Sequence, residues 1–157
     1  MVDAWITNAS TTVEAMVNPI AAACDGGYVP DRLYLLENPE VTDAVDRAIA
    51  FATAVIEAYG GDEPAVELTR LDNDRAFDRV RTHVGDAIEA VHDEGGRAAV
   101  DITPGRKFMS AIAFAAGIRY EADHVFYFYL HSADYYGLSY AGMPRTAGQL
   151  YDFTEEL

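Results

Sequence analysis

The residues best suited to chemistry lie in the stretch DITPGRKFMS, residues 101–110, which contains Lys107. Lys107 is the only lysine of a chain that has ten arginines and 26 aspartates and glutamates. Gly105 lets the backbone approach a ligand closely, and Arg106 and Lys107 add positive charge. A helix that begins here turns its unpaired amide groups and the positive end of its dipole toward an anion. These residues favour a phosphate-binding site.

Lys107 has a second interpretation, since a lysine in the first turn of a helix can simply be solvated. A cation at a helix N-terminus opposes the helix dipole, however, so a lysine there needs a compensating reason. We expect that reason to be a bound anion, with Lys107 at the electrostatic centre of its site.

Further polar side chains follow the predicted strands, at the carboxyl ends where an open α/β sheet binds its ligands. The loops are TNASTT (7–12), LDND (71–74), TPGRK (103–107) and HSADYY (131–136). The candidate ligand-binding residues in them are Thr7, Asn8, Thr11, Asn73, Thr103, Gly105, Arg106 and His131. The hydroxyls of Ser10, Thr11 and Thr12 can equally cap the next helix, and the two roles are compatible. His131 can also be an ordinary strand-end residue with one hydrogen bond.

Several common sites are not indicated. TNASTT lacks the glycine spacing of a dinucleotide fingerprint, and the chain contains no GxxxxGK[ST], so we expect neither NAD nor a P-loop nor any other organic cofactor. Cys24 has no cysteine partner, which argues against a structural zinc site, and no metal is expected.

Charge and hydropathy restrict the partners and the location. The net charge of −15 repels nucleic acid at long range, so we expect no binding to duplexes. Many carboxylates, more Asp than Glu and almost no lysine suit a halophilic cytosol, where salt also screens the repulsion. No apolar run reaches the roughly 18–20 residues of a membrane span and no signal peptide is evident, so we expect a cytoplasmic protein without a membrane partner.

The elements that must position these loops alternate along the chain. Apolar strands are expected at 4–7, 32–37, 65–69, 98–102 and 124–130. Helices are expected between them, with apolar stripes over 13–21, 41–59 and 77–91 and a fourth helix over 105–118. This pattern predicts one doubly wound, Rossmann-like α/β domain over residues 1–157, with a mainly parallel sheet covered by helices on both faces. Residues 135–157 are expected to add an edge strand or an irregular tail.

Single residues set the expected helix boundaries. Asn38 can cap the second helix ahead of Pro39, and Asp72 or Asn73 can open the third. Pro19 lacks an amide donor, so it should kink the first helix or delay its regular part to about that position. His83 and His92 are expected on the solvent side or flank of the third helix and receive no role.

Three stretches together carry a resemblance: TNASTTVEAMVNP, VDITPGRKFMSAIAFAAG and HVFYFYLHSADYYG. In this order, over residues 3 to 140, the chain resembles the CRISPR-associated Rossmann fold family, the sensor domains for cyclic oligoadenylates. The residues that match the family signature after the fourth strand are Asp101, Ile102, Thr103, Gly105, Lys107, Met109 and Ser110. Pro104 replaces a common glycine, and Arg106 replaces a common small hydroxyl residue.

The resemblance implies a homodimer that holds a ring of adenylates, with cyclic tetra-adenylate as the expected ring. Lys107 would contact phosphate or ribose, with Ser10 and Thr11 across the pocket. No effector domain is expected. In this respect the chain resembles the ring nucleases, which switch off type III CRISPR signalling. The implied chemistry is metal-independent attack of a ribose 2′-hydroxyl on the adjacent phosphodiester, with Lys107 and Ser10 as catalytic candidates.

Two other functions remain open from the sequence. The first is a sensor or regulator that binds cyclic oligoadenylate without cleaving it. The second is a flavodoxin-like domain for another small anion. The many tyrosines between 120 and 151 can belong to the strand core and surface, to a dimer surface, or to a stacking site for adenines.

Overall fold

The computed structural model of the chain describes residues 1–73 and 75–157. The strands are β1 (Asp3–Asn8), β2 (Arg32–Glu37), β3 (Ala65–Arg70), β4 (Arg97–Asp101), β5 (His124–Leu130) and β6 (Gly148–Asp152). The α-helices are α1 (Val13–Asp25), α2 (Thr42–Ala58), α3 (Phe77–Asp93), α4 (Lys107–Arg119) and the short α5 (Phe153–Glu156). Single 3-10 turns lie at Pro39–Val41, Ala133–Tyr135, Tyr140–Gly142 and Arg145–Ala147.

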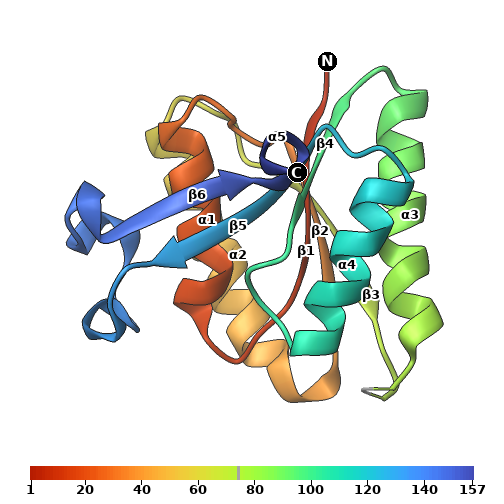
Figure 1. The fold of residues 1–157 in the computed structure, drawn as a ribbon, viewed down its shortest axis with the longest axis horizontal. Coiled ribbons are helices and arrows are strands. Elements are labelled where there is room, and N and C mark those ends of the chain that lie inside the picture. Colours follow the sequence, from red (N-terminus) through yellow and green to blue (C-terminus); the bar gives the residue numbers. More distant parts are fainter. Residues whose placement is uncertain (74) are drawn as a thin grey trace.

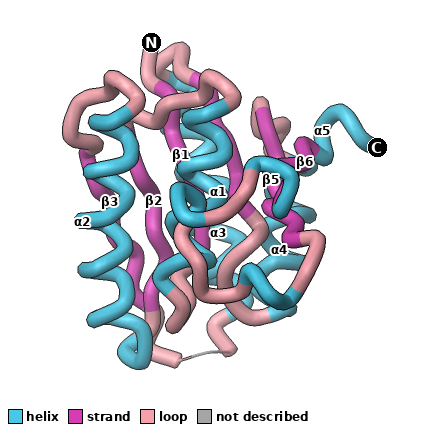
Figure 2. Tube along the Cα trace, turned by 90° about the vertical axis from the view of Figure 1, so that its left-hand side faces the viewer, coloured by secondary structure: helices cyan, strands magenta, loops and turns pink. Residues whose placement is uncertain are grey.

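The strands form one sheet in the order β3-β2-β1-β4-β5-β6. All neighbours are parallel except β5 and β6, which pair antiparallel. Helices α1 and α2 lie on one side of the sheet and α3 and α4 on the other, as Figures 1 and 2 show. The predicted fold class, a doubly wound and mainly parallel α/β domain, is confirmed.

The core is built by strands that are apolar on both faces, as expected for parallel strands covered by helices. Along β1, Trp5 packs into the cluster with Ile20 of α1 and Ile56 of α2. The next residue, Ile6, packs into the opposite cluster with Ile88 of α3. This alternation fixes which β1 side chains face each helix layer and which reach the strand ends.

Two helix starts differ from the sequence prediction. Helix α1 begins at Val13 and continues through Pro19, so the predicted delay to Pro19 is wrong. Burial of Met16 and Val17 in the α1–α2 layer stabilises the first turns despite the proline. Asn38 accepts the Glu40 amide at 3.0 Å, so it acts as a cap, but it opens a 3-10 turn and α2 begins only at Thr42.

The third and fourth helices also begin later than predicted. Helix α3 starts at Phe77 and not directly after Asp72 or Asn73, because Asn73 Oδ1 instead accepts the Arg75 amide at 2.9 Å in a local turn. The predicted loop 71–74 includes residue 74, which lies outside the described residues. Helix α4 starts at Lys107, two residues after Gly105.

The C-terminal part of the chain closes one side of the sheet. The edge strand expected in residues 135–157 is β6, which pairs with β5 after the 3-10 turns. Among residues 1–73 and 75–157, no helix has both the length and the apolar character needed to cross a bilayer.

Candidate functional site

The carboxyl ends of the neighbouring strands β1 and β4 are the switch point of the sheet, called the crevice below, because the chain leaves them in opposite directions. After β1 it turns to α1 on one face of the sheet, and after β4 it turns to α4 on the other. This is the switch point at which open α/β sheets bind ligands. Neither Thr12 before α1 nor Arg106 before α4 caps its helix with its side chain, so the first-turn amides remain suited to an anion.

Asn8, the last residue of β1, lies at the base of the crevice. It is fully buried, yet neither its amide oxygen nor its amide nitrogen has a hydrogen-bond partner. Gly105 covers it: its backbone has φ +98°, and a Cβ added there would lie 3.1 Å from Asn8 Cβ. An unsatisfied buried amide is rare and costs about 1–3 kcal/mol, so Asn8 holds an unused donor and an unused acceptor directly beneath Gly105.

The charged and hydroxyl residues of the two loops surround this position. Thr11, Arg106 and Lys107 are exposed, and Ser10 is half-buried. The Arg106 guanidinium lies 3.8 Å from the Glu40 carboxylate. Ser10 Oγ accepts the Thr12 amide at 3.1 Å, so its hydroxyl closes a turn just before α1 and does not cap the helix itself. The hydroxyl proton remains available for another acceptor.

Thr103 anchors the loop that carries Gly105 and Lys107. Its Oγ1 accepts the Phe128 amide of β5 at 2.9 Å, and its own amide donates to Asp101 Oδ1 at 2.9 Å. Asp101 is fully buried, and this burial raises its pKa to about 7. The start of the loop is therefore fixed from β4 and from β5.

The Thr7 side chain lies beneath the strand ends and does not reach the surface of this structure. Strand alternation turns its side chain inward, where it is 2% exposed. Its hydroxyl donates to Asp101 Oδ2 at 3.3 Å. Thr7 thus supports the crevice from below.

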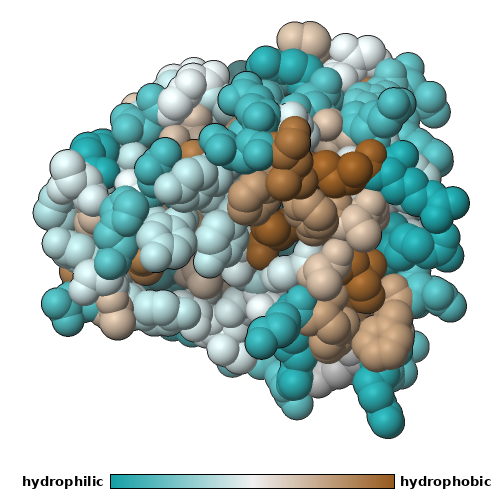
Figure 3. Space-filling view, viewed as in Figure 1, coloured by the Kyte–Doolittle hydropathy of each residue, from teal (hydrophilic) through white to brown (hydrophobic). Residues whose placement is uncertain are grey.

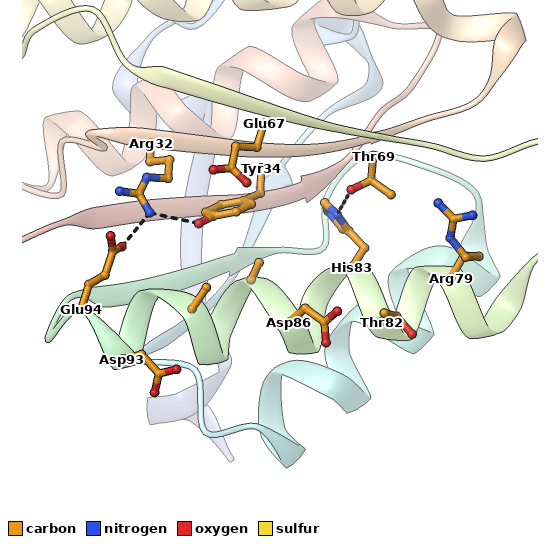
Figure 4. Close-up of a pocket in the computed structure, with 12 residues that line it drawn as sticks. Arg32, Tyr34, Glu67, Thr69, Arg79, Thr82, His83, Asp86, Asp93 and Glu94 are labelled. Carbon is orange, nitrogen blue, oxygen red and sulfur yellow. Dashed lines mark hydrogen bonds and ion pairs between the residues drawn. The ribbon is translucent and has the colours of Figure 1, made fainter.

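His83 was expected on the solvent side or flank of α3, and this is wrong. The ring is buried, with Nε2 3.2 Å from the Thr7 carbonyl oxygen and Nδ1 3.3 Å from Thr69 Oγ1 (Figure 4). Burial lowers the His83 pKa to about 4, so the neutral ring donates from Nε2 to Thr7 and accepts at Nδ1 from Thr69. Polar contacts therefore run from Thr69 through His83 and Thr7 to Asp101, beneath the crevice.

The hollow in Figure 4 lies between α3 and the strands β2 and β3 and encloses about 680 Å³. Arg32 in this hollow pairs with Glu94 at 2.7 Å. The hollow is also lined by three further carboxylates, from Glu67, Asp86 and Asp93, and by the guanidinium of Arg79. Negative charge therefore exceeds positive charge there. This negative charge disfavours a phosphate in the hollow despite its volume.

Two predicted residues lie outside the crevice. Asn73 belongs to the β3–α3 connection, and β2 separates β3 from β1. His131 follows β5, is exposed, and its ring contacts Tyr129 edge-on at 5.3 Å. Apart from the buried Thr7, the other predicted residues lie at the ends of β1 and β4 or in the loops that follow them, and the contact of Gly105 with Asn8 joins the two loops. These residues are Asn8, Ser10, Thr11, Thr103, Gly105, Arg106 and Lys107. Within the part of the chain that the structure describes, no three His, Cys, Asp or Glu side chains are grouped so as to hold a metal ion.

Comparison with known proteins gives a result for structure only. No protein-family model matches the sequence, and no curated protein matches it. A type III CRISPR defence DNA nuclease activated by cyclic oligoadenylate superposes with a TM-score of 0.62 at 19% identity, over 81% of this chain and 18% of that one. The chain shares its fold with this nuclease.

Two further solved structures are similar. Can2 from Sulfobacillus thermosulfidooxidans, in complex with cyclic tetra-adenylate, has a TM-score of 0.58 at 17% identity, over 80% of this chain and 31% of that one. Csm6 from Enterococcus italicus, bound to cyclic hexa-2′-fluoro-hexa-dAMP, has a TM-score of 0.59 at 13% identity, over 85% of this chain and 34% of that one. The chain therefore spans about a third or less of each of these proteins, and the likeness is one of fold.

Proposed function

We propose that this protein binds cyclic oligoadenylate, with cyclic tetra-adenylate as the expected ring, in the crevice between β1 and β4. The observation that carries the proposal is the buried, unpartnered amide of Asn8 between two helix N-termini, with Lys107 in the first turn of α4. Amide N–H groups and an ammonium are the donors that a phosphodiester requires. The proteins of shared fold that contain bound cyclic nucleotides support the choice of ligand.

We also propose a homodimer formed across the outer face of α4. This helix is apolar nearly all round, and its exposed residues include Ala111, Ala115 and Ile118. Figure 3 shows an apolar area in the middle of the face where Figure 1 draws α4 and α5. A helix apolar on all sides is normally buried, and a twofold axis running along the strands would let two crevices share one ring.

The dimer is tested by matched charge insertions. Ile118 is 45% exposed on α4, and Phe51 is 44% exposed on α2, on the other side of the sheet. Ile118→Glu should yield a monomer in light scattering at micromolar concentration, while Phe51→Glu should leave the dimer intact. A monomeric wild type in high salt would refute the dimer.

Cleavage of the ring is the finer part of the proposal. The ribose 2′-oxygen would bond to the adjacent phosphorus, the bond from phosphorus to the 5′-oxygen would break, and a 2′,3′-cyclic phosphate would remain. The 2′-hydroxyl proton leaves to solvent, and the 5′-oxygen gains a proton. Lys107 and the α4 amides would stabilise the charge on the phosphorane, with Ser10 orienting the attack. Loss of the ring would end signalling by it.

A sensor that binds without cleaving is the second candidate, and one observation favours it. In residues 1–73 and 75–157, two carboxylates contact the residues of this site, and both are already engaged. Glu40 lies 3.8 Å from the Arg106 guanidinium. Asp101 is fully buried and bonded to Thr7 and Thr103. A carboxylate placed to take the proton of a ribose hydroxyl is therefore missing from these contacts. Incubation of labelled cyclic tetra-adenylate with the protein in EDTA separates the candidates, because linear products indicate the enzyme and an unchanged, tightly bound ring indicates the sensor.

Binding is tested at Lys107 with a control on the same helix. An ammonium bonded to phosphate contributes about 1.5–3 kcal/mol, so Lys107→Ala should weaken ring binding by roughly 10- to 150-fold. Arg119→Ala, at the other end of α4, removes the same charge from the chain and should change binding little. Lys107→Arg should restore binding in part. Equal affinity of all variants, or preference for flavin or ordinary nucleotides over the ring, would overturn the proposed function.

A further inference from the structure

A second cavity opens beside the crevice, between α1 and β5, and encloses about 210 Å³. Thr12 and Thr103 line it, and both also belong to the loops of the crevice. The other lining residues include Glu14, Ala15 and Pro19 from α1, Phe128 and Leu130 from β5, and Tyr135 and Tyr136 from the segment that follows. A group bound at the crevice could extend directly into this cavity.

The cavity has aromatic and apolar walls. On β5, Phe128 faces α1, where it is 5% exposed in a cluster with Ala22. Tyr127 and Tyr129 point to the opposite face, toward Phe153 and Tyr151. Tyr127 and Tyr129 also line the cavity, but since their rings lie against Phe153 and Tyr151, the aromatic rings offered to a ligand are those of Phe128, Tyr135 and Tyr136. Tyr136 is 75% exposed at the rim.

The segment that carries Tyr135 and Tyr136 is held against α1 by one buried side chain. Asn18 is 5% exposed, its Nδ2 donates to the Leu138 carbonyl oxygen at 2.9 Å, and its Oδ1 accepts the Tyr140 amide at 2.8 Å. Gly137, between Tyr136 and Leu138, has φ +81° and permits the turn. The cavity is thus preorganised, which reduces the ordering cost of binding.

We infer that this cavity holds one adenine base of the ring, an inference that rests on the proposed function. A planar base fits aromatic walls, on which stacking is favourable for any base. Selection among bases comes from Glu14, whose carboxylate accepts a hydrogen bond from the exocyclic amine of adenine. The carbonyl oxygen that guanine has at the corresponding position would face this carboxylate and be repelled.

The experiment uses two probes on the intact protein. Cyclic tetra-adenylate is titrated into wild type, Tyr136→Ala and Tyr136→Phe, and AMP and GMP are titrated into the same proteins and into Glu14→Gln. Tyr136→Ala should weaken binding of the ring and of AMP by roughly 5- to 150-fold, and Tyr136→Phe should bind as wild type does. Glu14→Gln should lower the ratio of AMP affinity to GMP affinity at least several-fold. Any general effect of the lost charge on anion binding acts equally on AMP and GMP and cancels in this ratio.

Tyr59→Ala is the control, since Tyr59 is a 38% exposed aromatic at the end of α2 away from the crevice. It should leave both affinities unchanged. Ring binding that is equal in wild type and Tyr136→Ala overturns the base site and leaves the proposed function standing. AMP binding that depends on Tyr136, without ring binding by wild type, overturns the proposed function and the assignment of the cavity to the ring, and indicates an adenine site for mononucleotides instead. Failure to bind either probe overturns both.

Discussion

Gly105 offers a direct test of the crevice, because two separate features make a side chain unfavourable there. Its φ of +98° is a conformation that residues with a Cβ rarely adopt, which costs about 1–2 kcal/mol. An added Cβ would also lie 3.1 Å from Asn8 Cβ, in a closely packed site that cannot relax freely, which costs about 1–3 kcal/mol. Lower entropy of the unfolded chain offsets about 0.4–1 kcal/mol, so Gly105→Ala should destabilise the fold by roughly 2–4 kcal/mol.

Gly27 provides the matched control. Its φ is +97°, and an added Cβ would meet nothing within 4 Å, so Gly27→Ala carries the backbone cost alone. Urea unfolding should show a loss of about 1 kcal/mol for Gly27→Ala, and the difference between the two variants measures the contact with Asn8.

Ligand binding provides the second measurement. To avoid Asn8, the loop of Gly105→Ala must shift, and the shift displaces the N-terminus of α4 that the ligand uses. Cyclic tetra-adenylate should therefore bind Gly105→Ala at least tenfold more weakly and Gly27→Ala unchanged, a loss of about 1.4 kcal/mol or more. Equal stability and equal affinity of the two variants would refute the packing of Gly105 on Asn8 and the crevice built on it.

Three further predictions concern pH and salt. Because the pKa of Asp101 is raised to about 7, the folded protein keeps a proton that the unfolded chain releases above about pH 4. The stability that this group contributes is therefore lost as pH rises from about 4 to 7. Asp101→Asn should gain stability relative to wild type over that range in urea unfolding, and parallel pH curves would contradict the buried acid. The lowered pKa of His83, about 4, makes stability fall as pH falls from about 6.5 to 4, because the unfolded chain takes up a proton that the folded protein does not bind. His83→Gln should therefore lose less stability than wild type over that range in urea unfolding. At a net charge of −15, raising KCl from about 0.1 to 1 M should raise the unfolding midpoint, and a fall would argue against adaptation to salt.

The fold could be predicted because hydrophobic periodicity and turn residues agree along the chain. The segment 32–37 is an observed strand at the predicted bounds, and so is 124–130. The helix starts were harder, since local signals compete with packing. Pro19 indicated a late start for α1, but burial of the residues before it outweighed the missing amide. Asn73 has the chemistry of a cap and uses it in a turn four residues before α3.

The positions of site residues at strand ends could be predicted from the sequence. The burial of the residues beneath them could be predicted only in part. Lys107, Gly105 and Asn8 lie where loops after parallel strands must lie. The polarity of histidine predicts a solvent-facing His83, although this residue lies three residues after Val80 and four before Ala87, on the same buried stripe of α3. The carboxyl group of Asp101 gave no local signal of its burial, which results from the pairing of β4 with β1 and β5.

The antiparallel direction of β6 determines where the chain leaves the domain. Because Asp152 pairs with Phe126 near the start of β5, the C-terminus returns to the amino ends of the parallel strands, the edge from which β1 also begins. Figure 1 shows both chain ends on that side. A tether attached at either end therefore leaves the crevice open, so the protein can be immobilised through its termini for ligand titration.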